Sequence, residues 1–160
     1  MGLDFYGFYV KKGETPRDVL RFSYGDFMDR ELFYGRKSWE LVDALQCDTQ
    51  DTCLSELTLE NWVNLMEILS PISPYFDEIH SVYHNLYYVD EDFDDLKERF
   101  PKEYRLIKMY EEWYDKNFDE EPVLGYDSSV VYMKTFWEAA DKVLDYLENP
   151  DYSVWMRASY

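Results

Sequence analysis

Basic residues are missing from the segment between residues 38 and 96, which contains no Lys and no Arg. Acidic residues run through the same segment: Glu40, Asp43, Asp48, Asp51, Glu56, Glu60, Glu67, Asp77, Glu78, Asp90, Glu91, Asp92, Asp94 and Asp95. They supply most of the chain's net charge of −18. Proteins that bind nucleic acid need basic patches, so this charge excludes direct contact with a phosphate backbone.

Glycine is also scarce, with 6 residues in the chain, and none stands in a G-x-G-x-x-G or G-x-x-x-x-G-K pattern. The sequence therefore lacks a phosphate-binding loop, and it contains no serine nucleophile elbow. No stretch approaches 18 consecutive apolar residues, so we expect no membrane association. The first ten residues lack a basic region followed by an apolar run, so we expect no signal peptide and a cytoplasmic protein.

Potential metal ligands are few. Cys47 and Cys53 are separated by five residues, which is wider than a zinc knuckle, and we expect both to be reduced thiols. His80 and His84 are the only two histidines and share a helix face, but Ser81 stands where a zinc protease of the His-Glu-x-x-His type has its general base. We expect no metal and no cofactor.

Aromatic residues are abundant, at 19% of the chain, and 46% of all residues are hydrophobic. Disordered acidic chains are poor in aromatic residues, so this composition indicates a packed core. The length of 160 residues suggests one domain, 1–160. At this length about two-thirds of the unfolded surface can be buried, so no disulfide or metal is required for stability.

The hydrophobic pattern predicts an α+β domain that is mostly helical, with short strands at the N- and C-terminal ends. We predict strands over residues 3–11, 130–133 and 152–159, and an irregular segment over 23–35. Helices are predicted over 16–22, 36–46, 58–70, 73–89, 92–100, 101–116 and 135–148, several of them behind a capping Ser or Thr. The helix after Thr58 is expected to bury Leu59, Trp62, Val63, Met66 and Leu69. We expect the two terminal strands to pair.

The acidic segment has two interpretations. One is the solvated surface of an acidic protein. The other is an anionic surface that occupies the nucleic-acid-binding groove of a basic protein, where carboxylates compete with phosphates for Arg and Lys. Aromatic residues beside acids would then act as anchors. The predicted partner-binding residues are Tyr87, Tyr88, Asp90, Glu91, Asp92, Phe93, Asp94 and Asp95.

The two ends of the chain resemble a loose group of small phage and bacterial proteins. The resemblance lies in Met1-Gly2-Leu3-Asp4 with the aromatic Phe5, in Tyr34-Gly35-Arg36-Lys37 and in Ala158-Ser159-Tyr160. It implies a phage accessory protein, a class that often inhibits bacterial defence. It implies no catalytic residue.

Together these observations predict a protein that is not an enzyme. We expect a phage-type inhibitor that blocks the basic nucleic-acid-binding surface of a host defence nuclease complex, either a CRISPR effector or a restriction complex. Two alternatives remain open. One is an immunity protein that neutralises a basic toxin nuclease, and the other is a metal-dependent enzyme built on His80 and His84.

Overall fold

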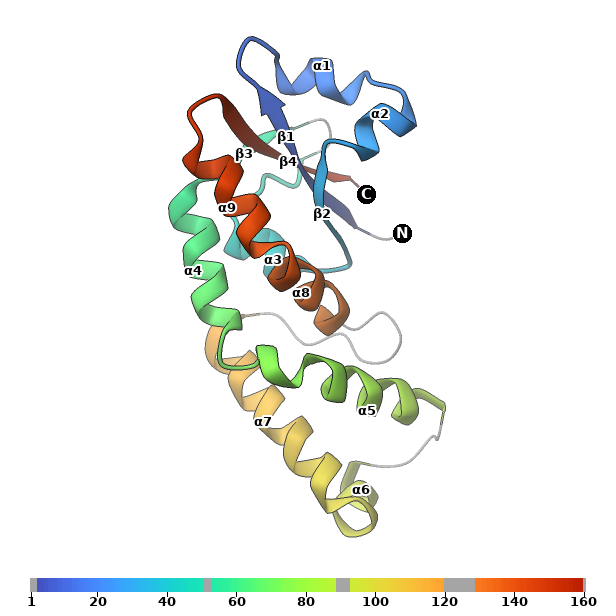
Figure 1. Cartoon of the computed structure of the whole chain (residues 1–160). Helices are drawn as coiled ribbons and strands as arrows, with labels where there is room; N and C mark the ends of the chain where they lie inside the picture. Colours follow the sequence, from blue (N-terminus) through green and yellow to red (C-terminus); the bar gives the residue numbers. More distant parts are fainter. Residues whose placement is uncertain (1–2, 51–52, 89–92, 120–128, 160) are drawn as a thin grey trace.

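The computed structural model describes residues 3–50, 53–88, 93–119 and 129–159 (Figure 1). Its strands are β1 (Asp4–Lys11), β2 (Glu31–Arg36), β3 (Ser55–Glu56) and β4 (Tyr152–Ser159). Its helices are α1 (Pro16–Leu20), α2 (Tyr24–Met28), α3 (Trp39–Ala44), α4 (Leu59–Leu69), the 3₁₀ turn η1 (Ser73–Tyr75), α5 (Phe76–Tyr88), α6 (Phe93–Arg99), α7 (Pro101–Asn117), α8 (Ser129–Glu138) and α9 (Ala140–Glu148). The predicted α+β class, mostly helical with strands at both ends, is confirmed.

The sheet is antiparallel, with the strand order β2-β1-β4-β3. The two terminal strands pair along their whole length, from Asp4 opposite Ser159 to Lys11 opposite Tyr152. The expected pairing of the chain ends is therefore confirmed, and Figure 1 shows the two termini side by side. Because β1 and β4 are the central strands, the first and last segments of the chain form the middle of the sheet.

Short-range signals predicted the helix starts well. Thr15 and Asp18 form a reciprocal capping box at α1, with N···O distances of 3.1 and 3.2 Å. These hydrogen bonds hold the pKa of the Asp18 carboxyl below its ordinary value. Thr58 caps α4 by accepting a hydrogen bond from the Asn61 backbone.

Two local predictions were wrong. The segment 23–35, expected to be irregular, contains α2 and most of β2. The segment 130–133, expected to be a strand, lies inside α8, and Thr135 is no N-cap because the helix already begins at Ser129. Instead the Thr135 hydroxyl donates to the Val131 carbonyl. In α8 the β-branched residues at 130 and 131 follow the tertiary packing of the helix rather than their own strand preference.

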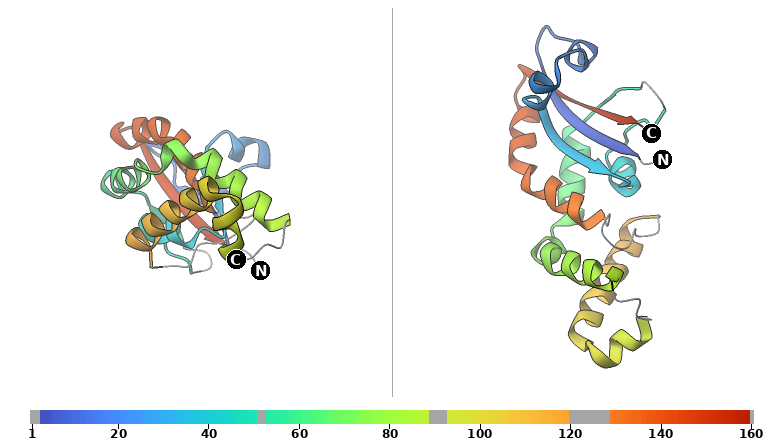
Figure 2. Two further views of the ribbon diagram at one scale, coloured as in Figure 1. Left: turned by 90° about the horizontal axis from the view of Figure 1, so that it is seen from below. Right: turned by 90° about the vertical axis from the view of Figure 1, so that its right-hand side faces the viewer.

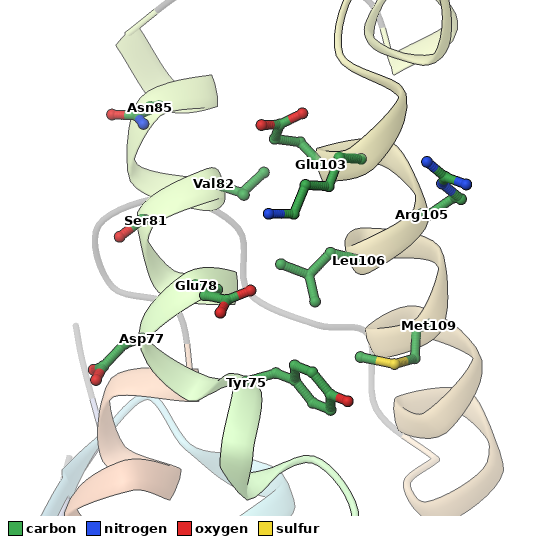
Figure 3. A pocket seen from close by; sticks show the side chains of 11 residues that line it. Tyr75, Asp77, Glu78, Ser81, Val82, Asn85, Glu103, Arg105, Leu106 and Met109 are labelled. Carbon is green, nitrogen blue, oxygen red and sulfur yellow. The ribbon is translucent and has the colours of Figure 1, made fainter.

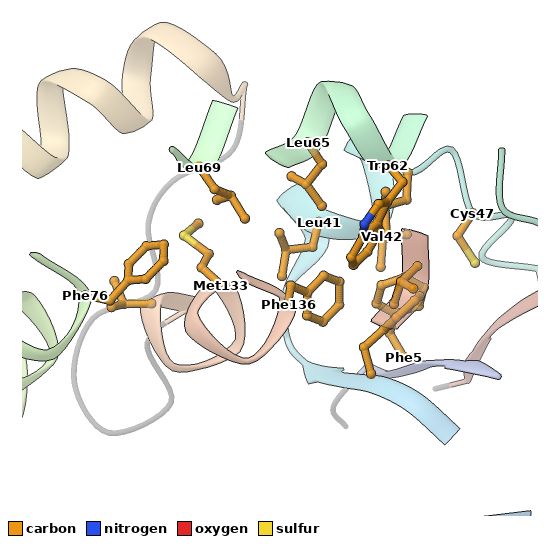
Figure 4. Packing of buried hydrophobic residues seen from close by; sticks show 14 of the residues in the cluster. Phe5, Leu41, Val42, Cys47, Trp62, Leu65, Leu69, Phe76, Met133 and Phe136 are labelled. Carbon is orange, nitrogen blue, oxygen red and sulfur yellow. The ribbon is translucent and has the colours of Figure 1, made fainter. Parts of the chain in front are cut away.

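Helices pack on the sheet in two places. Helix α8 packs against β2, α9 against β4, and α4 against both of these helices. Figure 4 shows the resulting core, in which Phe136 of α8 contacts both Phe5 of β1 and Trp62 of α4. Side chains alternate along a strand, so Phe8 and Val10 form a second cluster under α1 and α2.

The end of the molecule away from the sheet consists of α5, α6 and α7, coloured green to orange in Figures 1 and 2. The main core continues into it through Phe76 and Ile79 of α5 and Ile107 and Tyr110 of α7. All four side chains are at most 3% exposed. Helix α5 packs on both α7 and α8, so the helical end and the sheet share one hydrophobic cluster.

The buried side of α4 differs from the prediction. Trp62, Leu65 and Leu69 are its fully buried side chains, whereas Leu59 and Val63 are 41% and 38% exposed. The apolar stripe of α4 is thus wider than the part of it that the core covers. Sequence spacing alone could not distinguish the buried apolar residues from the exposed ones, because both sets follow a helical period.

Candidate functional site

The predicted binding segment 87–95 spans the end of α5 and the start of α6. Asp90, Glu91 and Asp92 lie outside the described residues, as do the side chains of Tyr87, Tyr88, Phe93 and Asp94. The Asp95 side chain is described and is exposed. A binding role for this segment therefore stays a prediction.

Elsewhere the base-free segment places nearly all of its described carboxylates in solvent. Glu40 is the exception, at 2% exposure within α3. The exposed members besides Asp95 are Asp43, Asp48, Glu56, Glu60, Glu67, Asp77 and Glu78. Among these, Asp77 alone forms an ion pair with a described residue, Lys134, at 2.6 Å. The rest offer their charge to solvent or to a partner.

Grooves run along both sides of α4. On one side, a groove of about 360 Å³ between α3, α4 and the end of α7 is lined by Asp43 and Asp119 together with three Asn side chains. A neighbouring groove of about 740 Å³ between α4 and α7 holds Glu112 and Lys116. On the other side, a groove of about 460 Å³ separates α4 from α8 and α9.

The charged residues that line these grooves are nearly all acidic. The exposed carboxylates are Asp43, Glu67, Glu112, Asp119, Glu138 and Asp141, and we call this set the acidic α4 face. Among the described lining residues, Lys116 is the one basic side chain. Carboxylates that outnumber the bases beside them create a negative potential that attracts basic partners.

Two Trp side chains hold α4 in place between these grooves. The Trp62 indole N–H donates to the Ala140 carbonyl at the start of α9, at 3.3 Å. The Trp113 indole N–H of α7 donates to the Ile68 carbonyl near the end of α4, at 3.0 Å. Both ends of α4 are thereby attached to neighbouring helices, so the acidic α4 face rests on a rigid support.

The groove between α5 and α7 has a different character (Figure 3). Its apolar floor includes Val82 and Leu106, which point into the space between the helices. Its charged lining is mixed, with Asp77, Glu78 and Glu103 beside Lys102 and Arg105. Acids and bases nearly balance there, whereas six exposed acids accompany one described base in the grooves beside α4.

The sequence located part of this face. Asp43 and Glu67 lie in the base-free segment, but Glu112, Asp119, Glu138 and Asp141 do not. Glu112, Glu138 and Asp141 come from stretches in which acids and bases are mixed, and Asp119 begins a short acidic run, Asp119-Glu120-Glu121. Folding brings these acids beside α4 while Lys102 and Arg105 line the α5–α7 groove, so the sequence alone did not show that they share a face.

His80 and His84 lie one helical turn apart on α5, with ring centroids 6.0 Å apart. The described residues contain no cluster of three or more His, Cys, Asp or Glu side chains suited to hold a metal ion. Burial and the neighbouring His84 lower the pKa of His80, with a further lowering from Lys134 and an opposing effect from Asp77. The neutral imidazole of His80 is therefore favoured.

This pKa shift predicts a pH dependence of stability. Because the pKa of His80 is lower in the folded protein than its ordinary value of 6.5, the unfolded state binds the proton more readily. The stabilisation is complete above pH 6.5 and is lost as the pH falls through the folded-state pKa. Urea unfolding at pH 7.5 and at pH 5.5, compared with the variant His80→Gln, measures it. The stability difference between the two proteins should change with pH, and a constant difference would contradict the assignment.

The two cysteines are free thiols, as expected. Cys47 is buried, and burial raises the pKa of its thiol to about 11. Cys53 is half-buried, and desolvation together with Asp48 raises its pKa as well. Thiolates are the reactive form of cysteine, so both thiols are protected at neutral pH, and Cys47 is protected by its position too.

We expect a thiol reagent at pH 8 to modify Cys53 first. Cys47 should react only at the rate at which the protein opens, because its sulfur lies in the core. Mass spectrometry after timed alkylation, with and without denaturant, resolves the two sites. Equal rates in the native protein would show that Cys47 is more accessible than its burial implies.

Within the described residues, every helix is too short or too polar to cross a membrane. No family model matches the chain, and no curated protein or solved structure matches it either.

Proposed function

We propose that this protein is an acidic binding protein that covers the basic, nucleic-acid-binding surface of another protein. The observation that carries the proposal is the acidic α4 face, where six exposed carboxylates line grooves that hold one described base, Lys116. Such a surface attracts Lys- and Arg-rich surfaces over a distance and repels nucleic acid.

The chemistry of the face fits this role. Carboxylates compete with phosphates for the same guanidinium and ammonium groups, and charge-assisted hydrogen bonds to Arg are among the strongest in proteins. The half-buried Trp113 and Trp137 beside the acids supply the kind of aromatic surface that contributes most to interface energies. The grooves give a partner's side chains places to insert.

The class of partner follows from this competition and from the resemblance of the chain ends to phage and bacterial proteins. We propose a host defence nuclease complex, either a CRISPR effector or a restriction complex. In that setting the protein is an inhibitor, acts by occlusion and performs no reaction.

Capture from bacterial lysate tests this function. The immobilised protein is exposed to a lysate whose nucleic acid has been digested, and the retained proteins are eluted with a salt gradient. We expect the retained proteins to bind nucleic acid, to elute below about 0.5 M salt because screening weakens charge pairing, and to be released by added DNA duplexes. A retained toxin nuclease would make the protein an immunity protein.

Retained proteins that have no nucleic-acid-binding surface would contradict the proposal. Retention that neither salt nor DNA duplexes can reverse would also contradict it. In that case the carboxylates would not be paired with the Lys and Arg side chains that bind DNA. A lysate from a strain with CRISPR and restriction genes deleted serves as the control for partner class.

A further inference from the structure

We propose that the groove between α4 and α9, the α4–α9 groove, receives an amphipathic helix of the partner, with apolar residues on one side and Lys or Arg on its flanks. The inference rests on the proposed function and adds to it a position and a mode of binding. The groove has a volume of about 460 Å³ and is walled by α4 on one side and by α8 and α9 on the other, so a partner helix can pack between these walls.

The first argument is the surplus of apolar surface. Val63 is 38% exposed although it lies on the apolar stripe of α4, one turn from the exposed Leu59. Met66 and Trp137 are half-buried in the same groove. Leu144 joins them from α9 and is also half-buried. An apolar groove of this kind on a strongly charged protein is typical of an interaction site.

The second argument is the charge of the rim. Glu67 stands on the α4 side, and Glu138 and Asp141 stand on the α8–α9 side. No Lys or Arg among the described residues lines this groove. Lys134 reaches Glu138 at 3.8 Å, but it also binds Asp77 at the shorter distance of 2.6 Å. The rim is therefore complementary to basic flanks.

These features select one occupant. A second copy of the chain would bring a net charge of −18 against an acidic rim, and like charges oppose that association. A neutral apolar helix would fill the groove but offer no basic partner to the acids of its rim. A helix with apolar residues spaced i, i+4 and i+7 and with basic neighbours satisfies both the floor and the rim.

A displayed library of random peptides tests this occupant. The peptides have about sixteen residues, enough for about four helical turns. The selected sequences are made as fluorescent peptides, and their affinity is measured by anisotropy. We expect basic amphipathic sequences, and we expect Val63→Asp to weaken their binding by about tenfold or more, as for a central interface contact.

Met28→Asp is the matched control, because Met28 is 44% exposed on the distant helix α2. It introduces the same charge and should leave peptide affinity within about twofold, the range of a residue outside the contact. The pair Glu138→Gln and Asp141→Asn should weaken binding and reduce its salt dependence. Circular dichroism confirms that each variant is folded.

The inference is overturned if no peptide is enriched, if the enriched peptides carry no basic residues, or if Val63→Asp and Met28→Asp have equal effects. Failure here is distinct from failure of the proposed function. The latter is tested with Asp43, Glu112 and Asp119, which lie outside the α4–α9 groove. Partner capture that depends on those three but not on Val63 would overturn the groove alone.

Discussion

Replacing Asp43, Glu112 and Asp119 by their amides is expected to weaken binding to the basic partner by about a hundredfold. Each of these exposed carboxylates can pair with one Lys or Arg, at about 1 kcal/mol per pair. Three such losses amount to about 3 kcal/mol, which is about two orders of magnitude in Kd. Isothermal titration calorimetry with the captured partner measures the change directly.

The matched control removes the same charge elsewhere. Asp26 and Asp29, in and next to α2, and Glu98 in α6 are exposed acids remote from α4, and their amide triple variant has the same net charge. We expect it to bind within about threefold of the unchanged protein, because remote charges act mainly on association rates. If both triple variants lose affinity equally, binding depends on total charge and the acidic α4 face has no special role.

The predicted segment 87–95 is tested in the same assay. A variant with Lys at positions 90, 91, 92, 94 and 95 reverses its five acidic charges. Loss of binding in this variant together with retention in the Asp43, Glu112 and Asp119 variant would assign the interface to that segment. Loss in both would indicate one extended interface that includes both regions.

Gly7→Ala is expected to be the most destabilising single change in the sheet. Gly7 lies in the central strand β1, opposite Phe33 of β2, and a Cβ atom at this position would overlap with the outer atoms of the Phe33 ring. Phe33 cannot move aside without losing its contacts with Trp62 and Phe136. We expect the free energy of unfolding to fall by about 3 kcal/mol or more, from overpacking and the lost aromatic contacts.

Urea denaturation measures this change against a glycine control. A Cβ atom added at Gly25 in α2 meets no atom within 4 Å, so Gly25→Ala should be neutral or slightly stabilising. Phe33→Leu in the Gly7→Ala background should recover part of the loss, since it removes the clash. Equal stabilities of Gly7→Ala and Gly25→Ala would contradict the packing described for β1 and β2.

The fold was predictable where a residue type has a strong preference for one local position, such as a helix N-cap or first turn. Thr15, Thr58 and the prolines at helix starts marked α1, α4 and α7 within a few positions. The strand β2 was not predictable in this way, because its place in the sheet depends on Phe33 covering Gly7, a contact between residues 26 positions apart. The first part of α8 was missed for a similar reason, since its buried Val130 and Met133 follow the core rather than the local strand preference, whereas the helix predicted from residue 135 included Phe136.

The candidate site was half predictable. The absence of bases between residues 38 and 96 identified an acidic region that includes Asp43 and Glu67. The grooves that give these acids a context come from α7, α8 and α9, whose acids are mixed with bases along the sequence. Val63 was predicted to be buried because its spacing matches the apolar stripe of α4. In the structure the core leaves it exposed, and it lines the α4–α9 groove.

Displacement of DNA from the captured partner tests the central claim most directly. A fluorescent DNA duplex is bound to the partner at about 0.1 M salt, where the Debye length is about 10 Å, and the protein is added while anisotropy is recorded. The acidic α4 face predicts stoichiometric release of the duplex, and little release by the variant with amides at Asp43, Glu112 and Asp119. A duplex that stays bound while the protein joins the complex would contradict occlusion of the nucleic-acid-binding surface.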